Sequence, residues 1–199
     1  GEIFLNGSWK IVPPLSLEAG MRMEHSAIEA RGDAHRERSF FYPKPRLLLA
    51  WAPDDKSQVR LRAERVLGQL NFADFVATSN LSGNGVSAGN ADLRPEQRWQ
   101  LEAAVERHFW EKGAVTVSLL HEDITDLKDY VPVTATLDAP GNIAHAISDK
   151  FTVTGTLPLD LLGLKNGLLK ANMFWYQSEV VDPVTGEVIE KTALDVRKD

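Results

Sequence analysis

Apolar and polar residues alternate along much of this chain, which is the pattern of β-strands that present one apolar and one polar face. From Ile3 to Ile11 the apolar residues occupy mainly odd positions, and the same phase returns after Pro13-Pro14. The alternation recurs in eight segments, at residues 3–11, 15–23, 47–51, 59–67, 99–109, 115–119, 151–157 and 169–175. We therefore expect an all-β chain of eight strands, with the start of a ninth near Val188.

The stretch from Arg94 to Trp110 has a composition that could suggest a helix, because it is rich in Glu, Ala and Arg. Its apolar residues nevertheless fall at every second position, as Trp99, Leu101 and Ala103 show. An amphipathic helix would place them three and four residues apart. We therefore predict a strand.

The connections between the expected strands alternate in length. Tight turns follow Ile11, Ala52 and Trp110, and a somewhat longer turn follows Leu157. Longer polar connections follow Ala30, Leu70, Tyr130 and Val181. Because antiparallel strands reverse direction, the short turns would share one end of the sheet, an asymmetry that transmembrane barrels have. The predicted fold is an antiparallel up-and-down meander of about eight or nine strands, a segment of a larger transmembrane β-barrel.

The tryptophans give an independent indication of a membrane barrel. Aromatic belts at the two strand ends are expected there, because the rings favour the headgroup level of a bilayer. The alternative is a soluble sheet whose tryptophans cover the ends of its core. Three tryptophans precede or enter short turns and two lie towards long loops: Trp9, Trp51 and Trp110, then Trp99 and Trp175.

Charged residues of both signs occupy even positions on successive strands. Inside a barrel they would face the lumen or a plugging domain, where cross-strand pairs of opposite charge are favourable. On a soluble sheet they would face solvent. Two arginines fall on the odd face: Arg107 is near a turn and could reach the interface, whereas Arg65 requires a strand that has left the hydrocarbon. The predicted lumen-facing residues are Glu18, Arg22, Glu24, Arg60, Arg62, Glu64, Arg98, Glu102 and Glu106.

The composition narrows the classes of function. Lys+Arg 22 against Asp+Glu 28 give a formal net charge of −6, so the chain has no global electrostatic reason to bind nucleic acid. The absence of cysteine excludes disulfides, thiolate metal sites and cysteine nucleophiles. No apolar run reaches the roughly 20 residues of a membrane helix. The sequence from Gly1 lacks the basic and apolar regions of a signal peptide.

We expect no catalytic, cofactor or metal site. The histidines lack the short spacing of a zinc site, and His121-Glu122-Asp123 would place neighbouring side chains on opposite faces of a strand. His25-Ser26 cannot form a dyad on one strand face, and the chain has no Gly-x-Ser-x-Gly elbow. Gly83-Asn84-Gly85 lacks the lysine and the strand-to-helix context of a phosphate-binding loop.

The stretch Gly89-Asn90-Ala91-Asp92-Leu93-Arg94-Pro95-Glu96 resembles the Gly-Asn-x-Asp-Leu-(Lys/Arg)-Pro-Glu signature of TonB-dependent outer-membrane receptors. In that family the signature ends an extracellular loop and opens a barrel strand. Residues 42–47, 61–65 and 72–75 are similar to the strands and the loop that precede it, and the resemblance covers nearly the whole chain. The signature residues are Gly89, Asn90, Asp92, Leu93, Pro95 and Glu96.

The resemblance implies a barrel of roughly 22 strands that is plugged by an N-terminal domain. Such receptors lie in the bacterial outer membrane and take up a siderophore-iron complex or another scarce solute with energy relayed by TonB. We expect residues 1–199 to form one segment of that barrel, without the plug domain and not closed by this chain alone. The implied partners are outer-membrane lipid, the plug domain and TonB of the intact parent, and an unknown small solute, with no nucleic acid.

Two connections, residues 71–90 and 131–143, are the best candidates for contact with an external ligand, because loops on rigid scaffolds carry binding function. An open sheet exposes two edges and a broad apolar face, so we expect the isolated segment to self-associate. The alternative function is that of a soluble, non-catalytic β-sheet module that binds a partner.

Overall fold

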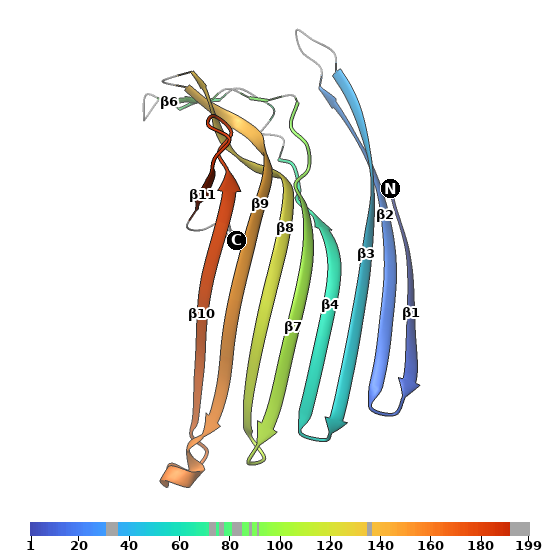
Figure 1. Ribbon diagram of the computed structural model, residues 1–199, viewed down its shortest axis with the longest axis vertical. Coiled ribbons are helices and arrows are strands. Elements are labelled where there is room, and N and C mark those ends of the chain that lie inside the picture. Colours follow the sequence, from blue (N-terminus) through green and yellow to red (C-terminus); the bar gives the residue numbers. More distant parts are fainter. Residues whose placement is uncertain are drawn as a thin grey trace.

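Nine strands form one antiparallel sheet in which each strand pairs with its neighbours along the chain (Figure 1). The computed structural model describes residues 1–30, 36–71, 75, 78–80, 85–87, 89–90, 92–134 and 137–191. The strands of the sheet are β1 (Glu2–Val12), β2 (Leu15–Ala30), β3 (Arg36–Asp54), β4 (Ser57–Leu67), β7 (Gln97–Phe109), β8 (Gly113–Thr134), β9 (Leu137–Pro158), β10 (Leu168–Val181) and β11 (Val188–Glu190). The predicted meander, the start of a ninth strand at Val188 and the strand after Arg94 are therefore confirmed.

The connections after β1, β3, β7 and β9 lie together at one end of the sheet, and the long connection between β4 and β7 leaves from the opposite end, the long-loop end (Figure 1). The predicted division by length is only partly met, because β8 and β9 are separated at the long-loop end by residues 135–136 alone. Residues 13–14, 55–56 and 110–112 make tight turns, and a short 3₁₀-helix, η2 (Leu159–Leu162), lies between β9 and β10. The long connection between β4 and β7 also holds a small hairpin that the sequence pattern did not predict, β5 (Thr78–Asn80) with β6 (Gly85–Ser87). In the described part of the chain, no helix is long and apolar enough to cross a membrane.

The pairing register keeps odd-numbered residues opposite odd-numbered residues from β1 to β10. Leu17 faces Leu49, and Leu49 in turn faces Leu61. At the other side of the sheet, Leu119 of β8 faces Phe151 of β9. Since side chains alternate between the two faces of a strand, one face of the sheet carries the odd residues and the other the even residues.

The ladder between β8 and β9 is interrupted at Asp126, near the long-loop end of β8. Asp126 has a positive φ of 55°, and the pairing passes from Thr125–His145 to Leu127–Ile143 in an unchanged register, with Asp126 and Ala144 both unpaired. Beyond this interruption the odd residues of both strands turn to the side of the even residues before it. Leu127 and Ile143 join a small buried core there, which consists of Ile124, Leu127, Ile143, Ala146 and Val180.

The prediction of a loop at residues 131–143 is wrong. β8 continues to Thr134 and β9 begins at Leu137, so that most of this stretch is paired strand. The extended hairpin is held by the apolar core, since Leu127 of β8 and Ile143 of β9 pack there against Ile124, Ala146 and Val180. The other predicted ligand-contact stretch, residues 71–90, falls largely outside the described residues.

The sheet is split between β3 and β4 at the long-loop end. Pairing of these strands ends at Arg46, next to Pro45, while β3 continues alongside β2 as far as Arg36. Pro43 and Pro45 have no N–H group to donate to a ladder. The guanidinium of Arg65 lies in this split, because it donates to the carbonyl oxygen of Pro43 at 3.2 Å and to the side chain of Gln97. Arg65 thus bonds to groups within the chain at the end of β4.

Candidate functional site

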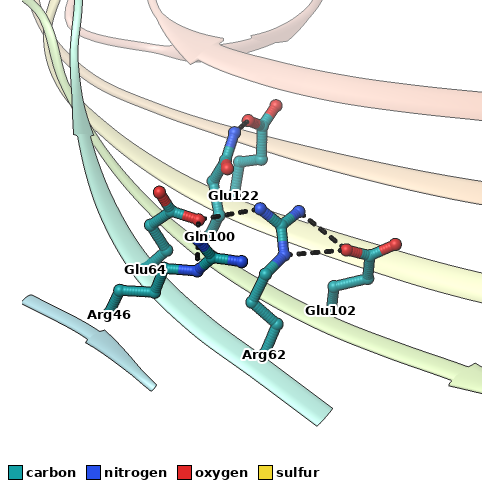
Figure 2. A network of polar contacts seen from close by, with 6 residues as sticks. All are labelled: Arg46, Arg62, Glu64, Gln100, Glu102 and Glu122. Carbon is teal, nitrogen blue, oxygen red and sulfur yellow. Dashed lines mark hydrogen bonds and ion pairs between the residues drawn. The ribbon is translucent and has the colours of Figure 1, made fainter. Parts of the chain in front are cut away.

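The even-numbered face of β3, β4 and β7 carries a chain of ion pairs (Figure 2). Arg62 donates to Glu102 at 2.7 and 2.9 Å and to Glu64 at 2.8 Å. Arg46 approaches the same Glu64 oxygen from the other side, at 3.9 Å. These pairs form because the register places Arg46, Glu64 and Gln100 in one row and Arg62 and Glu102 in the next. The charges are therefore matched across strands.

All the residues predicted to face a lumen lie on this even face, as their pairing register shows. Arg60 contacts Glu106 at 3.5 Å, and Arg22 contacts Glu2 at 3.2 Å. The sequence reading missed Lys44, Arg46, Gln100 and Glu122, which belong to the same networks. They occupy even positions, so the alternation that selected the other residues also contained them. The residues predicted and found on this face are Glu18, Arg22, Glu24, Arg60, Arg62, Glu64, Arg98, Glu102 and Glu106.

A buried ion triad lies at the start of β7. The guanidinium of Arg98 pairs with Glu96 and, at 3.1 Å, with Glu122. Gln100 donates to the other oxygen of Glu122 at 2.7 Å. The exposed fractions of these three charged side chains are only 10% for Arg98, 13% for Glu96 and 7% for Glu122. Removal of one partner would leave a buried charge without a partner of opposite sign. The triad therefore holds the start of β7 against β8.

The signature segment before β7 is fastened to the β8–β9 hairpin by side-chain amides. Asn142 accepts a hydrogen bond from the Arg94 N–H at 2.8 Å and donates to the Arg94 and Asp126 carbonyls at 2.9 and 2.8 Å. Asn90 donates to the Pro140 carbonyl at 3.0 Å and accepts from the Asp92 N–H at 2.8 Å.

Within this segment the apolar and polar signature residues have separate contacts. Leu93 is fully buried and Pro95 is also buried. Glu96 joins the ion triad and accepts the Lys128 N–H at 3.2 Å, while its carbonyl accepts the Gly68 N–H at 2.7 Å. Gly89 is half-buried and Asp92 is exposed. The motif thus acts here as a packed junction between the long connection and the sheet.

The even face of β8, β9 and β10 has a different character, because short uncharged side chains dominate it. Thr116 of β8 faces Thr154 of β9, and Thr154 faces Asn172 of β10. Ser118 faces Thr152 in the next row. The even face is therefore charged on β1–β7 and richer in hydroxyl side chains on β8–β10, where Glu122, Lys150 and Lys170 also lie.

The odd-numbered face is apolar and exposed over most of its length. Four of the five tryptophans lie on this face, and the fifth, Trp110, lies in the turn after β7. Trp99 and Trp175 are the last apolar residues of their strands before Gln97 and Gln177, so each lies at the edge of the apolar band. The exposed large apolar residues of this face are Ile3, Leu5, Trp9, Ile11, Met23, Phe41, Leu47, Trp51, Leu61, Trp99, Leu101, Val105, Val117, Leu119, Phe151, Leu169, Met173 and Trp175.

The edge of this apolar band does not follow one row of paired residues. On β8 the first polar residue beyond the band is His121, but its partner on β7 is Leu101. The same row continues through Ala63 on β4 and Leu47 on β3 and reaches Ala19 on β2, all of them apolar. The apolar edge therefore lies farther towards the long-loop end on β2, β3, β4 and β7 than on β8. Across β8, β9 and β10 it stays in one row, where the next residues are His121, Asp149 and Gln177.

Polar residues of the odd face are confined to the two ends of the band. At the short-turn end, Arg107 contacts Asp54 at 2.9 Å. At the long-loop end, His121 contacts Asp149 at 2.8 Å and His145 lies 3.6 Å from Asp123. Within the residues that the structure describes, no group of three or more His, Cys, Asp or Glu side chains could hold a metal ion.

Comparison with known proteins identifies structures that share this architecture. Three solved structures align with it: the siderophore receptor PirA from Pseudomonas aeruginosa (13% identity, TM-score 0.63), the alcaligin outer membrane receptor FauA from Bordetella pertussis (14%, 0.62) and the FrpB iron transporter from Neisseria meningitidis (11%, 0.58). The alignments cover 90%, 94% and 89% of this chain but only 36%, 31% and 25% of the respective structures, so the chain spans about a quarter to a third of their length. At these identities the likeness concerns the fold.

A search among curated proteins finds no match. A family model described as TonB dependent receptor-like, beta-barrel matches residues 1–163, which is most of the chain. The meander, the two-faced sheet and this match agree, and the chain belongs to the TonB-dependent receptor-like β-barrel family.

Proposed function

We propose that this chain is part of the barrel wall of an outer-membrane receptor that takes up a scarce solute such as a siderophore-iron complex. Its odd face would contact lipid, and its even face would line the lumen and contact a plug domain, with TonB supplying energy to the intact receptor. The family match and the receptors of similar fold support this role. The proposal includes no catalytic step and no resident cofactor.

The shift of the apolar edge between β8 and the strands before it is the observation that carries the membrane part of the proposal. Barrel strands are tilted by roughly 35–45° from the membrane normal. A lipid layer of constant height must therefore cross the sheet at shifted rows of the ladder. The row of His121 on β8 is apolar from Leu101 on β7 to Ala19 on β2, which is a shift of this kind, whereas the edge stays in one row from β8 to β10. A soluble sheet packed against another layer has no such requirement.

The long-loop end provides a rigid base for ligand contact. Hydrogen bonds from the side-chain amides of Asn90 and Asn142 tie the signature segment to the β8–β9 hairpin, and the apolar core of that hairpin is buried. We propose that the loops on this base contact the solute from outside the cell. The open sheet also leads us to propose that the isolated segment self-associates in buffer and becomes discrete in mild detergent.

The two faces can be tested with neighbouring cysteines on β9 of the intact receptor. This chain has no cysteine, so an introduced thiol is unique within it. Val153→Cys, labelled with bimane, should be quenched by brominated lipid. Thr154→Cys should react with a membrane-impermeant thiol reagent and resist that quenching. Equal behaviour of the two positions would contradict the assignment of the faces.

Uptake can be tested separately with the gene deleted and restored. Cells that lack the receptor should lose energy-dependent uptake of ⁵⁵Fe supplied with one siderophore among a panel. Unchanged uptake of every siderophore tested would remove the iron-complex proposal while leaving the membrane assignment in place.

A further inference from the structure

Two adjoining hollows open on the even face where β1, β2 and β3 meet. Their volumes are about 260 and 200 Å³. Both are lined by Asn6, Gly20 and Arg46, which lie in one row of the ladder. Gly20 creates the space, since a Cβ there would stand 2.5 Å from Asn6 Oδ1. A glycine between an amide and a guanidinium thus leaves room for a small group within reach of both.

The second hollow has more cations than anions in its lining, and we call it the Arg46 hollow. Glu18 and Arg46 line the first hollow, whereas Arg22, Lys44, Arg46 and Arg65 outnumber Glu64 in the second, so the second is better suited to a negative group. The carboxylates of Glu2 and Glu24, which pair with Arg22 and Lys44, are not part of the lining. The lining of the Arg46 hollow includes Asn6, Gly20, Arg22, Lys44, Arg46 and Glu64.

Arg46 has donors to spare, as does Arg22, which contacts Glu2 through Nε at 3.2 Å, but of the two only Arg46 lines both hollows. Glu64 lies 3.9 Å from its Nε, beyond hydrogen-bond distance, and the same oxygen accepts a hydrogen bond from Arg62 at 2.8 Å. Lys44, by contrast, donates to Glu24 at 2.6 Å. The Arg46 side chain is 54% exposed. A planar guanidinium with open donors binds carboxylates in a bidentate manner.

We propose that the Arg46 hollow is an oxyanion subsite that receives a carboxylate, with Arg46 as its main ligand. This rests on the proposed function, in which the even face is reached from the lumen. The carboxylate can come from an acidic side chain elsewhere in the intact receptor or from an acidic solute. An acidic side chain of the receptor would fill the hollow at rest, that is, without bound solute. An acidic solute would leave the hollow open until it binds.

Thiol reactivity at Asn6→Cys in the intact receptor tests the subsite. The probes are an anionic sulfonatoethyl and a cationic trimethylammonioethyl methanethiosulfonate of similar size. A hollow that is open at rest should favour the anionic reagent by about fivefold or more relative to Thr154→Cys, as expected for one unpaired charge at short range. Thr154 serves as the reference because the two residues paired with it, Thr116 and Asn172, are uncharged. Oxalate should slow the anionic reaction.

The variant Arg46→Glu distinguishes the two sources of the carboxylate from each other and from the absence of a subsite. If a carboxylate of the receptor fills the hollow, Asn6→Cys reacts slowly with both reagents and Arg46→Glu accelerates both. If the hollow awaits a solute, Arg46→Glu reverses the preference for the anionic reagent. Arg60→Glu, the same change on the same face outside the hollow, should leave either result unchanged.

Two outcomes would overturn the subsite: equal reaction with both reagents, or slow reaction that Arg46→Glu does not alter. The proposed lumen assignment is judged independently, because it depends on Val153→Cys and Thr154→Cys and not on Arg46.

Discussion

Arg98 shows at the scale of a single residue how a buried ion pair on the even face contributes to stability. Its guanidinium lies between Glu96 and Glu122 and is almost fully buried. Arg60 is a matched surface case, because it lies on the same face of the neighbouring strand and is 41% exposed, with Glu106 at 3.5 Å. A buried pair that loses one partner costs several times more than an exposed pair.

Arg98→Met should lower the free energy of unfolding by about 3–5 kcal/mol, because two carboxylates would stay buried without a cation. Arg60→Met should change it by no more than about 1 kcal/mol. Thermal unfolding in detergent micelles, followed by circular dichroism, measures both. The addition of Glu122→Gln to Arg98→Met should recover part of the loss. Similar losses for the two arginine variants would contradict the role given to the triad.

Asp182 begins the turn after β10, outside the strands, and gives a prediction about pH. Its Oδ1 accepts the N–H groups of Thr185 and Val184, each at 2.8 Å. These hydrogen bonds, that of Thr185 first, hold the pKa of the Asp182 carboxyl below its ordinary value. A lowered folded-state pKa gives stability that is present above the unfolded pKa and lost as the pH falls through the folded pKa.

Protection of the peptide that spans residues 182–187 against hydrogen exchange should therefore fall as the pH is lowered from about 5 through the acidic range. Mass spectrometry measures it, after correction for the intrinsic exchange rate. Asp182→Asn should make protection independent of pH, since its amide oxygen accepts the same bonds and does not titrate. The same pH profile for Asp182→Asn would show that another group is responsible.

At the scale of the elements, β7 and β8 show what the sequence pattern can and cannot reveal. The strict alternation of Trp99, Leu101 and Ala103 outweighs the helix-favouring composition of β7, and the strand was predicted. The interruption of the β8–β9 ladder at Asp126 was not. Leu127 and Val131 continue the odd apolar phase in sequence, so the pattern looks unbroken while the backbone has changed faces at Asp126.

The position of Arg65 could not be read from the sequence for a related reason. Alternation assigns it to the apolar face, but its contacts depend on a split between β3 and β4 that two prolines accompany. Prolines signal a break in a ladder, yet they do not say which side chain will bond to the freed carbonyl. The cross-strand partners of Asn142 were hidden similarly, because they come from segments distant in the chain.

Asp126→Val should destabilise the long-loop end by about 1–2 kcal/mol or more, because a β-branched residue is strained at the φ of 55° found there. Asp126→Asn should be nearly neutral, since Asn adopts this conformation readily. The loss should appear as faster hydrogen exchange in the β8–β9 hairpin, with the short-turn half of the sheet unaffected. Unchanged exchange in Asp126→Val would mean that the hairpin does not depend on the positive φ at residue 126.

For the whole molecule, the decisive property is the separation of an apolar odd face from a polar even face across β1–β10. Leu48 and Leu49 of β3 allow this to be tested with one residue type. Leu49 faces Leu17 and Leu61 on the odd face, whereas Leu48 faces Glu18 and Arg62 on the even face. The two side chains belong to adjacent residues, so strand position and burial by the sheet are nearly the same.

Leu49→Arg should lower the free energy of folding into lipid vesicles by about 2–4 kcal/mol, because a charge near the middle of a lipid-facing strand loses its hydration. Leu48→Arg should cost much less, since it lies beside Glu18 on the face proposed to be wet. Denaturant titration of the intact receptor in vesicles measures the difference, and detergent micelles should shrink it because water reaches the protein surface more easily there. If both variants lose the same amount, the odd face is not in lipid, and the apolar band must be covered by protein.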